Sequence, residues 1–195
     1  MELKEREDNK REFLEIVKTE IVRPGIDEFI SWLVSTDFFE APASTKFHLA
    51  EPGGLCKHSL NVYKRLYKIC VNEFGEENIN KESIAIIALF HDVCKACYYK
   101  TEMRNVKENG EWVQKPYYTI DDLLPYGHGE KSVYIINGYM RLTREEALAI
   151  NWHMGGFDKR VQGGDQSFSI AYYKYKLCTL MHLADVMATY LDETR

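Results

Sequence analysis

Hydrophobic residues recur at helical spacing along most of the chain. The predicted helices cover residues 2–23, 25–34, 55–74, 80–92, 128–140, 143–153 and 168–193. Pro24 ends the first of them because proline cannot continue a helix. Thr143 and Glu146 form a capping-box pattern that begins the sixth. The pattern therefore predicts a mainly α-helical protein.

Residues 98–120 follow a different pattern, in which aromatic and β-branched residues are frequent. These residues are Tyr98, Tyr99, Val106, Trp112, Val113, Tyr117 and Tyr118. Asn109-Gly110 separates the two halves, and Asn-Gly between extended segments is a strong hairpin signal. We therefore predict an all-α fold, a helical bundle with a β-hairpin inserted near residues 98–120. The turn-rich residues 35–54 are expected to lie along this domain and are candidates to line a site.

The length of 195 residues fits a single domain. Within it, residues 1–36 are expected to supply N-terminal helices, and residues 40–192 a core that carries the hairpin. No apolar run approaches the ~18 residues that a membrane-spanning helix needs, and the charged start lacks the apolar segment of a signal peptide. We therefore expect a cytoplasmic protein with no membrane partner. The net charge of −5 disfavours a broad nucleic-acid-binding surface.

The most unusual feature is an apolar helix that ends in two polar side chains. The apolar residues 84–90 lead directly into His91 and Asp92. A buried imidazole and a buried carboxylate each need a partner, and a divalent metal ion would satisfy both. Four further residues are candidate ligands on other predicted helices: His58, His128, His153 and Asp185.

Because the candidate ligands come from several helices, helix packing could bring them to one point. Mixed imidazole and carboxylate ligands suit iron, manganese, zinc or nickel rather than calcium. Six such ligands could hold one ion, or two ions with Asp92 as the bridge. A two-metal site produces hydroxide from water at neutral pH and stabilises in-line displacement at phosphorus.

The ordered set His58, His91-Asp92 and Asp185 resembles the HD superfamily of metal-dependent phosphohydrolases, over roughly residues 40–192. His128 and His153 resemble the additional histidines of its binuclear branch. That branch includes cyclic-dinucleotide phosphodiesterases, nucleases and symmetrical dinucleoside tetraphosphate hydrolases. The stretches AINWHMGG and HLADVM are most similar to the last group, while APASTKFHLAEPGGLCKHSL is more similar to the HD domains of some bacterial exoribonucleases. Similar stand-alone domains occur in bacteria and phages.

The chain departs from the pattern of the superfamily in three places. The usual His-Asp-x-Gly-Lys motif reads His91-Asp92-Val93-Cys94-Lys95, so a cysteine replaces the glycine while the lysine remains. Trp152-His153-Met154 stands where some binuclear members carry a His-His pair, which weakens the likeness to cyclic-dinucleotide phosphodiesterases. The hairpin has no evident counterpart in the family core.

The resemblance implies a role for each candidate residue. One metal ion is expected to be held by His58, His91, Asp92 and Asp185, and a second by Asp92, His128 and His153. A metal-bound hydroxide is then the nucleophile. Asp92 and Lys95 are the predicted catalytic residues. Lys95 lies about one turn beyond Asp92, so it is expected to face the same way and to neutralise a substrate phosphate.

Several polar residues are candidates to bind the substrate. They are Lys95, Lys131, Ser132, Lys159, Arg160 and His48. The lysine–serine pair follows a predicted ligand by about one turn, and the lysine–arginine pair stands in a glycine-rich loop. His48 either contacts the substrate or caps its loop. Hairpin aromatics could stack on a base or simply pack against the body.

Three classes of function fit these residues. The first is a phosphohydrolase that cleaves a phosphoester or phosphoanhydride bond of a nucleotide, dinucleotide or short oligonucleotide. The second is a module that senses a nucleotide without turnover, and the third is a di-iron oxygenase on the same ligand set. The expected partner is a small phosphorylated substrate, a nucleotide. The charged N-terminal helix is either solvated or forms the contact of a homodimer.

Overall fold

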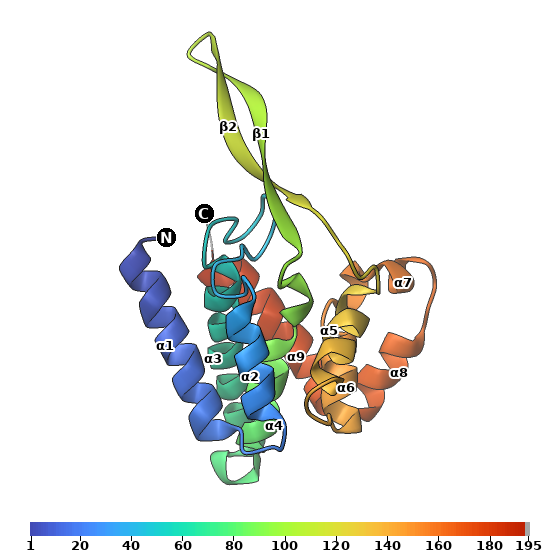
Figure 1. Cartoon of the computed structure of the whole chain (residues 1–195). Coiled ribbons are helices and arrows are strands. Elements are labelled where there is room, and N and C mark those ends of the chain that lie inside the picture. The colour runs from blue at the N-terminus through green and yellow to red at the C-terminus, as the bar shows by residue number, and fades with distance from the viewer. Residues whose placement is uncertain (194–195) are drawn as a thin grey trace.

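A computed structural model describes residues 1–193 and shows a body of helices with a two-stranded arm (Figure 1). The helices are α1 (Leu3–Glu20), α2 (Ile26–Ser35), α3 (Gly54–Phe74), α4 (Lys81–Phe90), α5 (His128–Asn137), α6 (Arg144–Asn151), α7 (Lys159–Gln162), α8 (Ser167–Lys174) and α9 (Lys176–Met187). Three 3-10 turns, η1 (Glu76–Asn78), η2 (Val93–Lys95) and η3 (Gly155–Phe157), and a π-helical turn, η4 (Ala188–Asp192), complete the body. The mainly helical fold with one hairpin confirms the predicted fold class.

Helix α4 is the centre of the core, and residues 83–90 are all buried. Asn80 begins it by accepting a hydrogen bond from the backbone of Ser83, as an N-cap does. The first two helices pack onto its far end through aromatic rings. The ring centres of Phe13 and Phe29 lie 5.9 and 4.8 Å from that of Phe90. These contacts hold the C-terminal end of α4, next to His91, in the core.

The predicted hairpin is present as β1 (Tyr99–Glu108) and β2 (Glu111–Ile120), which pair antiparallel. Asn109 and Gly110 both have positive φ, as the tight hairpin turn requires. Tyr99 pairs with Ile120 at the base of the hairpin. The arm stands out from the end of the body where the N- and C-terminal ends also lie (Figure 1).

A buried ion pair ties the first helices to α6. Glu146, with a side chain 1% exposed, accepts hydrogen bonds from Arg23 at 2.6 and 3.0 Å and from Ser83 at 2.7 Å. Glu146 also completes the predicted capping box with Thr143. One carboxylate therefore satisfies the start of α6 and joins three segments that are far apart in sequence.

Two predictions about the C-terminal third were wrong. The single helix expected over residues 168–193 is broken at Tyr175, whose backbone is extended, and it ends in the π-helical turn η4. The break forms because Glu145 of α6 accepts a hydrogen bond from the backbone of Leu177 and so caps a new helix. The expected glycine-rich loop contains η3 and the short helix α7. Among the described helices, none is long and apolar enough to cross a membrane.

Candidate metal centre

The carboxylate of Asp92 lies at the centre of a cluster of four imidazoles. Its Oδ2 atom lies 3.5 Å from His91 Nε2 and 3.8 Å from His58 Nε2. Its Oδ1 atom lies 2.6 Å from His128 Nε2 and 3.5 Å from His153 Nε2. Each carboxylate oxygen therefore faces a different pair of histidines.

Asp185 of α9 closes one side of this cluster. Its Oδ1 atom lies 3.3 Å from His58 Nε2, and His58 Nε2 in turn lies 3.3 Å from His91 Nε2. The structure thus brings together all six residues that the sequence suggested as metal ligands. They come from α3, α5, α9 and the ends of α4 and α6.

Two of the imidazoles are oriented by the helices that precede them. The Nδ1 atom of His91 lies 2.8 Å from the carbonyl oxygen of Ala88, and that of His153 lies 2.7 Å from the carbonyl oxygen of Ile150. A carbonyl oxygen can only accept, so each Nδ1 donates its proton. In the neutral rings the Nε2 atoms then carry no proton, and they point into the cluster, as metal-bound histidines require.

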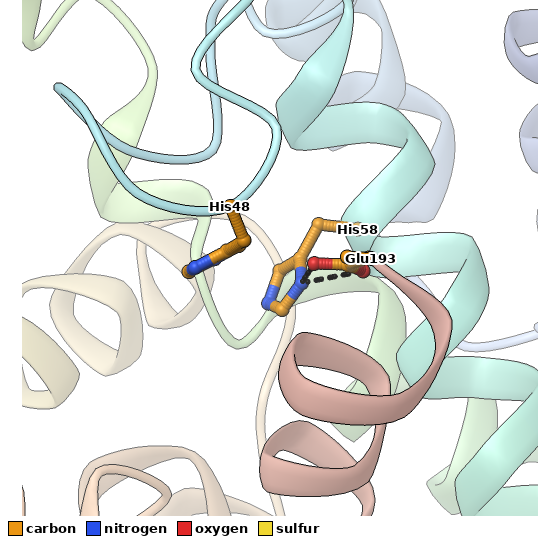
Figure 2. Close-up of side chains that lie close together, drawn as sticks. All are labelled: His48, His58 and Glu193. Carbon is orange, nitrogen blue, oxygen red and sulfur yellow. Dashed lines mark hydrogen bonds and ion pairs between the residues drawn. The ribbon is translucent and has the colours of Figure 1, made fainter. Parts of the chain in front are cut away.

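The other two imidazoles have side-chain partners at Nδ1. Both carboxylate oxygens of Glu193 lie 3.1 Å from Nδ1 of His58, and Figure 2 shows this pair beside the loop that carries His48. The sulfur of Cys94 lies 3.4 Å from Nδ1 of His128. The cysteine that replaces the glycine of the family motif therefore touches a predicted ligand.

Close packing of α5 against α6 brings two of the histidines together. A Cβ atom on Gly129 would lie 2.3 Å from the carbonyl oxygen of Asn151, so only glycine allows this approach. The ring centres of His128 and His153 are 5.3 Å apart as a result.

The cluster fits a divalent metal ion. The Nε2 atom of His153 is buried and has no hydrogen-bond partner within residues 1–193, although buried polar atoms normally have one. Among the described residues, four groups each have ligand atoms within 4.8 Å of one another: His48–His58–Glu193, His58–His91–Asp185, His91–Asp92–His153 and Asp92–Cys94–His128. A bound cation would satisfy the orphaned nitrogen and the clustered carboxylates together.

The charge of the buried Asp92 carboxylate is stabilised by Lys95 and by the imidazoles around it. Burial raises the pKa of Asp92, but Lys95, His91 and His128 outweigh this effect and hold it well below its usual range. Burial lowers the pKa of His58, but the carboxylates of Asp185 and Glu193 raise it to about 10. A proton therefore sits among these carboxylates, and a metal ion would take its place.

The two predicted catalytic residues, Asp92 and Lys95, contact each other. The Nζ atom of Lys95 lies 2.6 Å from Asp92 Oδ2 and donates a second hydrogen bond to the carbonyl oxygen of Ala43. Burial lowers the pKa of Lys95, but Asp92 raises it more, so the amine keeps its charge. Lys95 thus faces the same way as Asp92, as its spacing along the chain indicated.

A cavity of about 830 Å³ opens onto the cluster. Five residues of the long loop form part of its wall, as the sequence suggested: Ala43, Ser44, Thr45, Phe47 and His48. His48 lies in this wall, with its ring centre 5.0 Å from that of His58. Its buried Nε2 atom has no hydrogen-bond partner in the part of the chain that the structure describes. Burial lowers its pKa to about 4, so the neutral ring faces the cavity. His182 also lines the cavity and contacts the carbonyl oxygen of His153 at 2.7 Å.

The other four predicted substrate-binding residues are not among the described residues that line the cavity; they are Lys131, Ser132, Lys159 and Arg160. The amine of Lys131 pairs with Asp122, and the hydroxyl of Ser132 accepts from the backbone of Cys94. Lys159 is exposed on α7. Two of these side chains thus have other partners in the described structure, and a phosphate contact by any of the four stays a prediction.

Arg160 shows why a place in a glycine-rich loop is a weak indication of a phosphate contact. Its guanidinium pairs with Asp158 and Glu130 and lies 4.0 Å from the centre of the Trp152 ring. Two carboxylates and an aromatic face thus engage all of it. It braces α7 against the start of α5 and the end of α6 rather than facing the cavity.

Glu193 is the main site residue that the sequence did not reveal. It is buried, and Asn61 of α3 donates a hydrogen bond of 2.9 Å to it. In a regular helix, Glu193 would lie about 80° around the axis from Asp185. The π-helical turn η4, closed by the hydrogen bond from Glu193 N to Ala188 O, turns it back toward His58.

Comparison with known proteins identifies the family. The family model of the HD domain matches residues 55–189, well over half of the chain and all six clustered ligand candidates. Searches of curated proteins and of solved structures find no match. The chain therefore belongs to the HD domain family, whose members are generally metal-dependent hydrolases.

Proposed function

We propose that this protein is a metal-dependent phosphohydrolase that cleaves a phosphoester or phosphoanhydride bond of a nucleotide-like substrate, a dinucleotide or short oligonucleotide included. One observation carries the proposal. The two oxygens of Asp92 face two separate histidine pairs, as a carboxylate that bridges two metal ions would.

Each ligand set has a role in this proposal. His58, His91, Asp92 and Asp185 would hold one ion. Asp92, His128 and His153 would hold the other. Iron, manganese, zinc and nickel all suit these donors. When bound, such ions lower the pKa of water enough to supply hydroxide at neutral pH.

The side chains around the cluster would orient the substrate. Lys95 lies in the cavity wall next to Asp92, where its charge would stabilise a phosphoryl group as negative charge develops on it. His48 lies on the other side of His58 from Glu193 (Figure 2), and its Nε2 atom has no hydrogen-bond partner among the described residues. The proposed partner is therefore a small phosphorylated molecule rather than a long nucleic acid.

The test is hydrolysis of bis-p-nitrophenyl phosphate and of a panel of nucleotides by the purified protein with manganese or iron(II). We expect metal-dependent turnover that the double variant His91→Ala/Asp92→Ala abolishes. Asp165→Asn is a matched control because that carboxylate caps the backbone of Ser167 outside the cluster. Turnover that survives in the double variant would refute the proposal.

Two other outcomes would indicate a different function. Tight nucleotide binding without turnover under every metal would mean that the protein is a sensing module. Oxygen consumption by a reduced di-iron form, with no hydrolysis of any phosphoester, would mean that the same ligands support oxygenase chemistry.

A further inference from the structure

Four large apolar side chains surround the mouth of the cavity. They are Phe47, Ile120, Phe157 and Tyr190, and each is more than half exposed. They come from four separate segments, which are the loop before α3, strand β2, the turn η3 and the turn η4. We call these four residues the apolar rim.

The apolar rim is costly unless something covers it. Exposed apolar side chains that gather around one opening mark a ligand-binding site, whereas singly scattered ones need no explanation. Tyr98 and Tyr99 continue the same surface into the cavity. A flat aromatic group could therefore lie against these rings and remove them from water.

The cavity contains few cations. Among the described residues that line it, Lys95 is the only lysine or arginine, and Asp92 and the Ala43 carbonyl already engage its amine. Lys46, the nearest other lysine on that loop, is exposed, and its amine lies 5.1 Å from the centre of the Phe47 ring. Among the described residues that line the cavity, the lysine and arginine charge is thus confined to Lys95, beside Asp92.

This arrangement separates substrates by their number of phosphates. Proteins hold chains of phosphates with several arginine, lysine or backbone N–H donors. A polyphosphate bound at the cluster would place its distal phosphates against the apolar rim. A substrate with a single phosphoryl group would leave the rim to an uncharged group.

Resting on the proposed function, we propose that the substrate is a phosphoester with one phosphorus atom and a flat aromatic remainder, as in a nucleoside monophosphate. The phosphoryl group faces Asp92 and Lys95, and the aromatic group lies against the apolar rim. Hydrolysis forms a bond from water oxygen to phosphorus and breaks the ester bond. One proton of the water passes to the leaving alcohol, so the products are inorganic phosphate and a nucleoside.

The first test varies the phosphates at constant nucleoside. We expect kcat/KM for AMP to exceed that for ATP at least tenfold, and that for ribose 5-phosphate, which lacks the base, at least tenfold as well. Turnover of ATP that equals or exceeds that of AMP would overturn the inference while leaving the proposed phosphohydrolase intact.

The second test removes the apolar rim. Phe157→Ala and Tyr190→Ala should each raise KM for AMP about tenfold, the size of one stacking contact, and should leave KM for ribose 5-phosphate nearly unchanged. Tyr173→Ala is the matched control because this tyrosine is exposed on α8 and does not line the cavity. Equal changes for both substrates would contradict a contact with the base.

A third measurement does not depend on turnover. Isothermal titration of the metal-loaded protein should detect binding of adenosine but not of ribose, and Phe157→Ala should weaken it. If no phosphoester is hydrolysed, the proposed function fails, and adenosine binding then decides alone whether the apolar rim holds a base. Adenosine binding that is absent, or unchanged in Phe157→Ala, would overturn the role of the rim.

Discussion

Glu193 provides the sharpest test of how the cluster is assembled. Its carboxylate holds His58 by Nδ1, so that Nε2 faces Asp92 and Asp185. Replacing Glu193 with alanine removes the only described side chain within hydrogen-bond distance of this Nδ1 atom. We expect the metal affinity of the variant to fall because part of the binding free energy is then needed to orient the ring of His58.

The structure sets the size of this effect. Glu193 and His58 are both buried, so the loss leaves a donor that water reaches poorly. An unsatisfied buried donor costs about 1–3 kcal/mol. Partners of metal-bound histidines contribute about 10- to 100-fold in metal affinity, which corresponds to about 1.4–2.7 kcal/mol. The two ranges of free energy agree. We therefore expect the dissociation constant for the metal ion to rise about 10- to 100-fold.

The assay is competition for zinc or manganese with a chromophoric chelator. Glu193→Gln keeps an acceptor and loses the charge, so its affinity should lie between those of the wild type and Glu193→Ala. Asp192→Asn is the control because that carboxylate pairs with Arg65 at the surface. Unchanged metal affinity in a folded Glu193→Ala protein would refute the positioning role.

Three further predictions concern packing and pH. Gly129→Ala should lower the free energy of unfolding by about 1–3 kcal/mol and weaken metal binding, because the new Cβ atom would meet the backbone of Asn151. Urea unfolding measures the first effect, and competition with a chelator measures the second. Arg23→Ala should cost about 3–5 kcal/mol in urea unfolding, because it leaves the carboxylate of Glu146 buried without its cation, whereas the exposed Arg11→Ala should cost much less. Burial raises the pKa of Glu146, but the hydrogen bonds from Arg23 and Ser83 hold it below its ordinary value. The stability that the charged Glu146 contributes is therefore present above about pH 4.5 and is lost as the pH falls through the lowered pKa. The acid-induced loss of stability should accordingly be shallower in Arg23→Ala. A variant as acid-sensitive as the wild type would argue against this role of the ion pair.

Local sequence was enough to predict the ligands that lie at helix ends. His91 follows a buried apolar helix directly, and the carbonyl three residues earlier orients its ring. His153 follows α6 in the same way. Short-range helical geometry determines where both histidines lie, so the spacing of apolar residues was enough to predict them. The hairpin was predictable for a similar reason, since Asn109-Gly110 imposes its turn locally.

Contacts between distant segments were not predictable in this way. Lys131 seemed free to bind phosphate, but Asp122 engages it. Tyr175 interrupts a sequence with continuous helical spacing because a carboxylate on α6 caps the next helix. Each result depends on a partner that approaches through space, and no periodicity along the chain encodes it.

The sequence by itself determined that the chain is helical, where its hairpin turns, and which imidazoles and carboxylates could meet a metal ion. Only the tertiary structure decided that Glu193 holds His58, that Lys95 is the one lysine among the described residues of the cavity wall, and that apolar side chains surround the mouth. The physical reason is the range of the interactions. Helix propensity and turn chemistry act within a few residues, whereas the charge and shape of a cavity arise from side chains that folding alone brings together.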